Sequence, residues 1–272
     1  MASNQPGSCC ATGSMHLGAP TGEIQAIDGV NTYIAFAQDR KSRDEVLIFL
    51  SDIFGISNNS QLLADDFAAN GYLTILPDLF DGDQISLSEM KSGSTDVASW
   101  LSRHKTNRTD VIVAKTLSYA RDVLNAKRAG AIGYCFGGKV SLMFQNYFRV
   151  AVRYFKCMAH SGSIQYVCRF LKPGQIDVGY TAHPSYVTHD ELSTIGGPLS
   201  IAASSAIDKI FTTSLRNESE SILAKTGQPW QMNIFSHVDH GFGVRADLEH
   251  EMQRFAKEQA FCQAIGWFVH YL

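Results

Sequence analysis

The sequence predicts a doubly wound α/β fold, in which helices cover both faces of a mostly parallel β-sheet. Continuous apolar runs of strand length, such as residues 46–50, are typical of strands that are buried on both faces. Segments with apolar residues at helical spacing separate these runs, and such alternation is the pattern of a parallel sheet. Right-handed crossovers then place helices on both faces, and the default location for a site is at the carboxyl ends of the strands.

The chain opens with a segment that differs in composition from the rest. Residues 1–22 are rich in Gly, Ser, Ala and Pro, so we expect an irregular arm there. Residues 23–37 form two short alternating runs around Asp28-Gly29, a dipeptide that suits the tight turn of an antiparallel hairpin. We interpret residues 23–272 as a single domain, since one enlarged α/β domain can have this length.

Expected strands and helices alternate along the rest of the chain. The expected strands cover residues 46–50, 72–76, 129–134, 150–158, 198–203 and 231–235. The expected helices cover residues 61–70, 111–126, 137–147 and 248–271. Residues 81–108 are polar and interrupted by glycines, so we expect no regular element there.

The composition argues against several classes of protein. The formal net charge of −3 offers no basic field, so we expect no nucleic-acid partner. No run reaches the roughly 20 apolar residues of a membrane helix, and no basic start precedes an apolar run, so we expect a cytoplasmic protein without membrane contact. The six cysteines are few and unevenly spaced, which favours free thiols over disulfides. The adjacent Cys9-Cys10 lacks the partners of a zinc pattern, so we expect no metal.

The strongest local signal is Gly133-Tyr134-Cys135-Phe136-Gly137, which lies between an expected strand and an expected helix. A nucleophile at such a turn has a strained backbone, and the flanking glycines let strand and helix approach. A neighbouring imidazole readily ionises a thiol at this position, and the positive end of the helix favours the thiolate further. The alternative is a buried core cysteine in a tight strand-to-helix turn.

The fold requires the order nucleophile, acid, histidine, so the partners of Cys135 must lie downstream. Asp208 and His240 each follow an expected strand by a few residues, where a strand-end loop could present them. For His240 the alternative is a solvent-facing loop histidine. His237 falls almost on the strand itself, and we expect Asp239 to be solvated. Cys135, Asp208 and His240 therefore form the candidate triad.

The motifs that contain Cys135 and His240, together with several others, resemble the dienelactone hydrolase family, specifically its fungal branch. The resemblance extends over nearly the whole length of the sequence. The matching motifs are Cys9-Cys10-Ala11-Thr12-Gly13, Asp52-Ile53-Phe54-Gly55, Pro77-Asp78-Leu79-Phe80, Gly133-Tyr134-Cys135-Phe136-Gly137-Gly138, Ala182-His183-Pro184-Ser185-Tyr186-Val187 and His240-Gly241-Phe242. The resemblance implies the α/β-hydrolase fold.

The resemblance also implies roles for individual residues. Cys135 corresponds to the nucleophile, Asp208 to the orienting acid and His240 to the base. The backbone N–H groups of Ile53 and Phe136 correspond to the oxyanion hole, which would hold the negative charge of an attacked carbonyl.

Arg245 looks like the arginine with which the family binds a substrate carboxylate, a role that suits its planar guanidinium fork. The alternative is a solvated loop arginine. Asp52 stands where bacterial members carry a glutamate that helps to switch the cysteine between thiol and thiolate. A second substrate-binding arginine has no convincing counterpart, although Arg103 and Arg108 lie in the relevant region.

Three further side chains fall in the irregular stretch between the two later strands. His183, Tyr186 and His189 could form a lid or a pocket wall there, and His183 and Tyr186 are included among the candidate substrate-binding residues. The alternative for this stretch is an ordinary surface loop.

The sequence therefore predicts a cysteine-dependent carboxylic ester hydrolase that cleaves an ester, enol-lactone or thioester of a small carbonyl compound through an acyl-enzyme on Cys135. No metal or organic cofactor is expected, and a homodimer is left open. Two alternatives remain. The same pocket could catalyse lactonisation, elimination or rearrangement in secondary metabolism, or the protein could bind a small molecule without catalysis.

Overall fold

The computed structural model describes residues 16–37, 44–104, 106–135, 164–205 and 208–272. Within these residues an eight-stranded sheet has the order β1-β2-β4-β3-β5-β6-β7-β8. The strands are β1 Glu23–Ile27, β2 Val30–Ala35, β3 Glu45–Leu50, β4 Leu73–Pro77, β5 Arg128–Tyr134, β6 Val178–Ala182, β7 Leu199–Ser204 and β8 Trp230–Phe235. From β4 to β8 every neighbouring pair is parallel, which confirms the predicted mostly parallel sheet.

The antiparallel part of the sheet is the hairpin that the sequence predicts. β1 pairs with β2 in antiparallel register, and β2 pairs with β4 in the same sense. The turn between β1 and β2 consists of Asp28 with φ of 46° and Gly29 with φ of 79°. Two successive left-handed residues match the right-handed twist of the paired strands, so this turn fixes the register of the hairpin.

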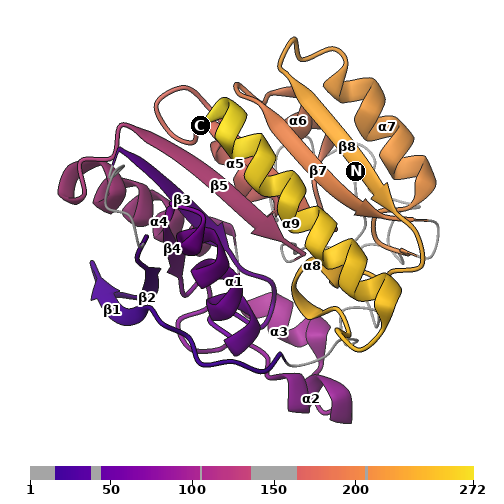
Figure 1. Cartoon of the computed structure of the whole chain (residues 1–272), viewed down its shortest axis with the longest axis horizontal. Coiled ribbons are helices and arrows are strands. Elements are labelled where there is room, and N and C mark those ends of the chain that lie inside the picture. Colours follow the sequence, from indigo (N-terminus) through magenta and orange to yellow (C-terminus); the bar gives the residue numbers. More distant parts are fainter. Residues whose placement is uncertain (1–15, 38–43, 105, 136–163, 206–207) are drawn as a thin grey trace, which may run out of the picture.

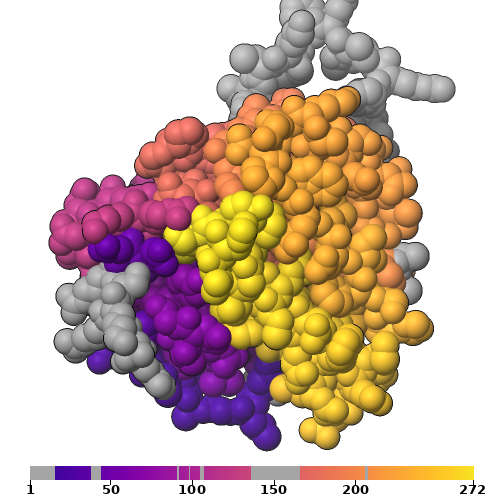
Figure 2. All heavy atoms as spheres, turned by 45° about the horizontal axis from the view of Figure 1, so that its top comes forward, coloured from indigo at the N-terminus to yellow at the C-terminus, as the bar shows by residue number. Residues whose placement is uncertain are grey.

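Helices cover both faces of the sheet, as predicted. The helices are α1 Asn58–Ala69, α2 Leu87–Ser92, α3 Val97–Arg103, α4 Thr106–Ser118, the π-helix η2 Tyr119–Val123, α5 Ile164–Phe170, α6 His189–Ser193, α7 Thr213–Leu223, α8 Phe242–Arg245 and α9 Glu251–Tyr271. Figure 1 looks onto the face that α1 and α9 cover. In Figure 2 the yellow α9 lies on the surface between the violet N-terminal part of the chain and the orange segments.

Two apolar clusters, one on each side of the sheet, form the core. Along β3, Val46, Ile48 and Leu50 belong to the cluster that includes residues of α4 and α5. Leu47 and Phe49 belong to the other cluster, which includes residues of α1 and α9. Because successive strand residues point to opposite faces, the continuous apolar run is explained by burial on both sides.

The expectation that residues 81–108 lack regular structure is wrong. This stretch contains α2, α3 and the start of α4. Ser86 and Glu89 form a reciprocal capping box at the start of α2, and Trp100 of α3 is buried against Phe80. These helices are short and depend on a cap and on a long-range aromatic contact, so helical spacing alone does not show them.

Strand β6 is not among the expected strands, because Gly179 and Thr181 interrupt its apolar residues. Gly179 is the second residue of β6, and a Cβ added there would lie 2.9 Å from Cγ1 of Val167 in α5. A glycine is therefore needed for close packing of α5 on the sheet. The expected helix 137–147 and strand 150–158 lie outside the described residues. No helix among the residues that the structure describes is long and apolar enough to cross a membrane.

Candidate active site

Five side chains with catalytic chemistry follow the carboxyl ends of neighbouring parallel strands. Asp52 follows β3, Cys135 follows β5, His183 follows β6, Asp208 follows β7 and His240 follows β8. These strands are consecutive in the sheet. Because parallel strands end at the same edge, residues that are distant in sequence meet there.

Cys135 occupies a sharp turn directly after β5. Its φ is 51°, in the left-handed region that a residue with a side chain rarely adopts, and it is fully buried. Its backbone N–H donates to the carbonyl of Ala182 at the end of β6, at 3.4 Å. The predicted strained backbone at the elbow is therefore confirmed, whereas the glycine and helix that the motif places after it lie outside the described residues.

His240 and Asp208 form the acid–imidazole pair expected from chain order. His240 Nδ1 lies 3.1 Å from Asp208 Oδ2, and both side chains have no exposed surface. An ionised carboxylate only accepts, so Nδ1 carries the proton and Nε2 faces away from Asp208. The backbone N–H groups of Ile210 and Phe211 donate to Asp208 Oδ1 at 2.7 and 3.2 Å, which fixes the carboxylate. The alternative of a solvent-facing His240 is therefore wrong.

The rival residues of the same loop lie in solvent. His237 and Asp239 are both exposed, on either side of the buried Val238. The expectation that Asp239 is solvated is therefore confirmed.

Ser185 completes the surroundings of the imidazole, and sequence reasoning assigned it no role. Its hydroxyl lies 3.1 Å from His240 Nε2 and 3.9 Å from Cys135 Sγ, and the residue is fully buried. His240 Nε2 therefore faces a hydroxyl and a thiol at once. No local motif identifies this serine, because only the packing of two loops brings it to the histidine.

The charges at the site couple His240 to both of its neighbours. Burial would lower the pKa of His240, but the Cys135 thiolate and the hydrogen bond to Asp208 outweigh it and raise this pKa to about 10. Burial likewise opposes ionisation of Asp208, yet the hydrogen bond from His240 and the imidazolium charge hold its pKa below the ordinary value. The geometry thus favours a protonated His240 that is paired with the Asp208 carboxylate and lies next to Cys135.

His183 lies inside the site, so the surface-loop alternative is wrong for His183 and Tyr186. His183 is fully buried, and Tyr186 is 5% exposed. The ring of His183 packs edge-on against the ring of His240, with centroids 5.0 Å apart. Gly243 leaves room for it, since a Cβ there would lie 3.1 Å from His183 Nε2. Burial lowers the pKa of His183 to about 4, so its ring is neutral at pH 7. His189, in contrast, is exposed.

Arg245 and Asp52 form an ion pair beneath the site, so Arg245 is not a solvated loop residue. Both are buried, and Arg245 Nη1 donates to Asp52 Oδ2. The N–H of Phe54 donates to Asp52 Oδ1 at 3.0 Å, and the guanidinium lies over the Phe54 ring, 4.9 Å from its centroid. Burial raises the pKa of Asp52, an effect that Arg245 opposes and the Cys135 thiolate reinforces. Gly241, with φ of 98°, makes room for the guanidinium.

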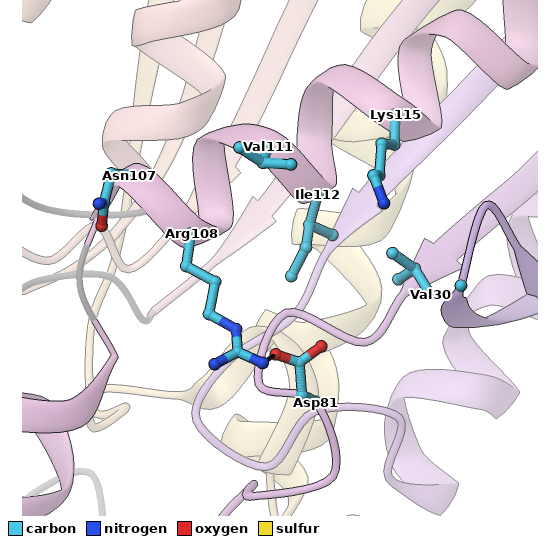
Figure 3. Close-up of a pocket in the computed structure, with 8 residues that line it drawn as sticks. Val30, Asp81, Asn107, Arg108, Val111, Ile112 and Lys115 are labelled. Carbon is cyan, nitrogen blue, oxygen red and sulfur yellow. Dashed lines mark ion pairs between the residues drawn. The ribbon is translucent and has the colours of Figure 1, made fainter.

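The two other arginines that sequence reasoning considered form exposed ion pairs of their own. Arg103 pairs with Asp83 and Arg108 with Asp81, and all four side chains are at least one-third exposed. Arg108 and Asp81, whose ion pair is drawn in Figure 3, line a hollow between the β1–β2 turn and α4. The volume of this hollow is about 370 Å³. None of the candidate catalytic residues lines this hollow.

The remaining predicted positions are only partly described. Ile53 follows Asp52 directly and is buried, so its backbone lies beside the site. Phe136, the other expected oxyanion donor, lies outside the described residues. Cys135, His183 and His240 could in addition hold a metal ion, because one ligand atom from each lies within 4.8 Å of the others.

Fold and site together define the class of the protein. The parallel strands, the helices on both faces and the left-handed residue after β5 are the features of an α/β-hydrolase.

Comparison with known proteins assigns the family. The model of the dienelactone hydrolase family matches residues 30–272. Hydrolase pyvD of Aspergillus violaceofuscus is 44% identical over 273 residues, covering 100% of this chain and 99% of the relative. Dienlactone hydrolase 1 of Gibberella moniliformis is 31% identical, and the match covers 97% of this chain and 93% of the relative. A candidate dienelactone hydrolase from Klebsiella pneumoniae shares the fold, with a TM-score of 0.69, 15% identity, and coverage of 93% of this chain and 100% of that one. The chain belongs to the dienelactone hydrolase family and is an ester hydrolase.

Proposed function

We propose that this hydrolase cleaves an ester, enol-lactone or thioester of a small carbonyl compound through an acyl-enzyme on Cys135. The observation that carries the proposal is the buried chain from Asp208 through His240 to Cys135, with Cys135 at a left-handed turn. Two relatives that are similar to this chain along nearly their whole length are named hydrolases, which supports the same class of reaction.

The first half-reaction forms the acyl-enzyme. His240 takes the proton of the Cys135 thiol, and the thiolate attacks the substrate carbonyl carbon. The backbone N–H groups of Ile53 and Phe136 would hold the resulting oxyanion. The intermediate then collapses: the bond to the leaving group breaks, His240 returns its proton to that group, and a thioester remains on Cys135.

The second half-reaction releases the acid. His240, neutral again, takes a proton from water, and the hydroxide attacks the thioester. The bond to sulfur breaks, and the proton returns to Cys135. Asp208 keeps the same imidazole tautomer through both halves. A thiolate leaves more readily than an alkoxide, so activated esters, enol lactones and thioesters suit this site better than amides.

Asp52 and Arg245 would link substrate binding to the state of the thiol. Arg245 Nη1 is engaged by Asp52, so a substrate carboxylate that binds this edge of the guanidinium would have to displace Asp52. The Asp52 carboxylate already lies close enough to Cys135 for their charges to interact, so a change in its pairing with Arg245 would be felt at the thiol. His183 and Tyr186 are the candidates for further substrate contacts, because both are buried in the loop after β6.

A substrate panel tests the proposal. We expect turnover of p-nitrophenyl acetate, an enol lactone and a thioester by the wild type, and loss of that turnover in Cys135→Ala. Cys262→Ala, which removes an exposed thiol on α9, is the matched control and should keep full activity. Equal rates in the wild type and in Cys135→Ala would refute covalent catalysis by Cys135, and no turnover of any substrate would favour a binding protein.

A further inference from the structure

His183 is a buried imidazole that takes no part in the proton transfers of the proposed hydrolysis. Its ring nitrogens make no hydrogen bond of normal geometry with a described residue, and their one polar contact is with the Cys135 thiol. A buried polar group without good hydrogen bonds destabilises the fold. Its backbone is also left-handed, with φ of 42°. Strain of this kind persists where the surrounding structure imposes it, which is typical of functional sites.

The ring belongs to a compact set of ligand groups. Cys135 Sγ and one ring nitrogen each from His183 and His240 all lie within 4.8 Å of one another, and all three residues are buried. We propose that Cys135, His183 and His240 bind a soft divalent metal ion, with Zn²⁺ as the ion that fits best, and that its binding reversibly stops hydrolysis. The ion acts here as an inhibitor and not as a cofactor.

The ligand types and spacing suit zinc. One thiolate and two imidazoles are ligands that Zn²⁺ prefers, and three protein ligands leave a fourth position for water. In a tetrahedral site with ordinary bond lengths, the ligand atoms lie roughly 3.3 to 3.6 Å apart. Closing the set around an ion therefore requires the ligand atoms, which lie within 4.8 Å of one another, to move closer together.

The second contact of His240 is the one that a metal-bound histidine normally makes. Asp208 accepts from His240 Nδ1 at 3.1 Å, which leaves Nε2 for the ion and fixes the ring. Ser185, 3.1 Å from Nε2, would give up this hydrogen bond and could hold a metal-bound water instead.

The charges around the set also match a divalent ion. Asp52 neutralises Arg245, the nearby cation. Asp208 and the Cys135 thiolate then supply the two negative charges that balance Zn²⁺ in a buried site. Binding releases one proton to solvent, the one that Cys135 and His240 share before the ion arrives.

Inhibition follows because the ion occupies the proposed nucleophile and the proposed base together. Only this consequence rests on the proposed function. The binding site itself depends on the ligand set alone, so the two are tested by separate measurements.

Binding is measured with Co²⁺, whose absorption bands report thiolate ligation and four-coordination directly. The protein carries Cys9→Ser and Cys10→Ser, so that this adjacent pair cannot bind the probe. We expect one equivalent of Co²⁺ to bind with a thiolate charge-transfer band. The band should vanish in Cys135→Ser, and the affinity should fall roughly 10- to 100-fold in Asp208→Asn, which loses the carboxylate that orients His240.

The histidine variants decide whether His183 is a ligand. His183→Phe keeps a ring in the same packing, and His183→Asn suits the left-handed backbone. Both should weaken Co²⁺ binding roughly tenfold or more, whereas the exposed controls His189→Phe and Cys262→Ser should bind as the parent does. Unchanged affinity in both folded His183 variants, or a thiolate band that survives Cys135→Ser, would overturn the site.

Hydrolysis assays with chelator and with added Zn²⁺ test the consequence. We expect the protein to be active with chelator, to lose activity when Zn²⁺ is added, and to regain it with further chelator. This result would support inhibition by the ion. Activity that is unaffected by Zn²⁺ at occupancies shown by displacement of Co²⁺ would overturn it. A Co²⁺ band in a protein without hydrolase activity would leave the metal site standing and count against the proposed function alone.

Discussion

Arg245 and Asp52 lie 193 residues apart in the sequence and form a buried ion pair at the candidate active site. Removing one member leaves the other charged and buried without its partner, which typically costs about 3–5 kcal/mol. We therefore expect Arg245→Met to lower the free energy of unfolding by about this amount at pH 7, as measured by urea denaturation. The double variant Asp52→Asn, Arg245→Met should lose clearly less. Equal losses in both would show that the pairing is not what stabilises Arg245.

Gly241 makes room for the Arg245 guanidinium, because a Cβ at this position would overlap Arg245 Nη2. Gly241→Ala should therefore destabilise the protein and reduce hydrolysis together. Gly71→Ala is the matched control: its φ of 96° is close to the 98° of Gly241, but nothing lies within 4 Å of an added Cβ. Thermal unfolding of the two variants separates backbone strain from the clash. A similar decrease in Tm for both would mean that the contact with Arg245 is unimportant.

Asp208 fixes the tautomer of His240, so Asp208→Asn should reduce kcat by about 10⁴-fold while KM changes little. Asp239→Asn alters an exposed carboxyl next to His240 in sequence and should leave kcat unchanged. Steady-state kinetics with p-nitrophenyl acetate compare the two variants. The assignment would be reversed if Asp239→Asn were the impaired variant.

His183 makes the fold sensitive to acid, since its pKa is lowered by burial from 6.5 to about 4. Below pH 6.5 the unfolded chain binds a proton that the folded chain does not bind until about pH 4, so stability decreases as the pH falls through this window. The shift corresponds to a loss of about 3 kcal/mol. We expect His183→Phe and His183→Asn, studied with chelator present, to lack this part of the acid loss. Urea denaturation from pH 7 to pH 4 gives the comparison, and parallel curves for wild type and variants would contradict it.

Much of the fold follows from patterns that are local in the sequence. Runs such as residues 46–50 are apolar because β3 is buried on both sides, and the strict order of nucleophile, acid and histidine led to Asp208 and His240. Strand β6 was not predicted, because close packing of α5 requires a glycine, Gly179, within the strand.

The parts of the site that the sequence did not predict depend on contacts between distant segments. Ser185 meets His240 only when the loops after β6 and β8 pack together, and nothing in its neighbours along the chain indicates this. The burial of His183 and the pairing of Arg245 with Asp52 have the same origin. Spacing in a single sequence carries no record of such contacts.

The position of the acyl group tests the central proposal most directly, because His240 Nε2 has both Ser185 and Cys135 close to it. Wild type, Cys135→Ala and Ser185→Ala are mixed rapidly with p-nitrophenyl acetate, quenched in acid and mapped by peptide mass spectrometry. We predict acetylation of Cys135 as a hydroxylamine-sensitive thioester in the wild type and in Ser185→Ala, and none at the site in Cys135→Ala. An acetyl ester on Ser185, with a burst of p-nitrophenol retained in Cys135→Ala, would contradict the proposal and make Ser185 the nucleophile.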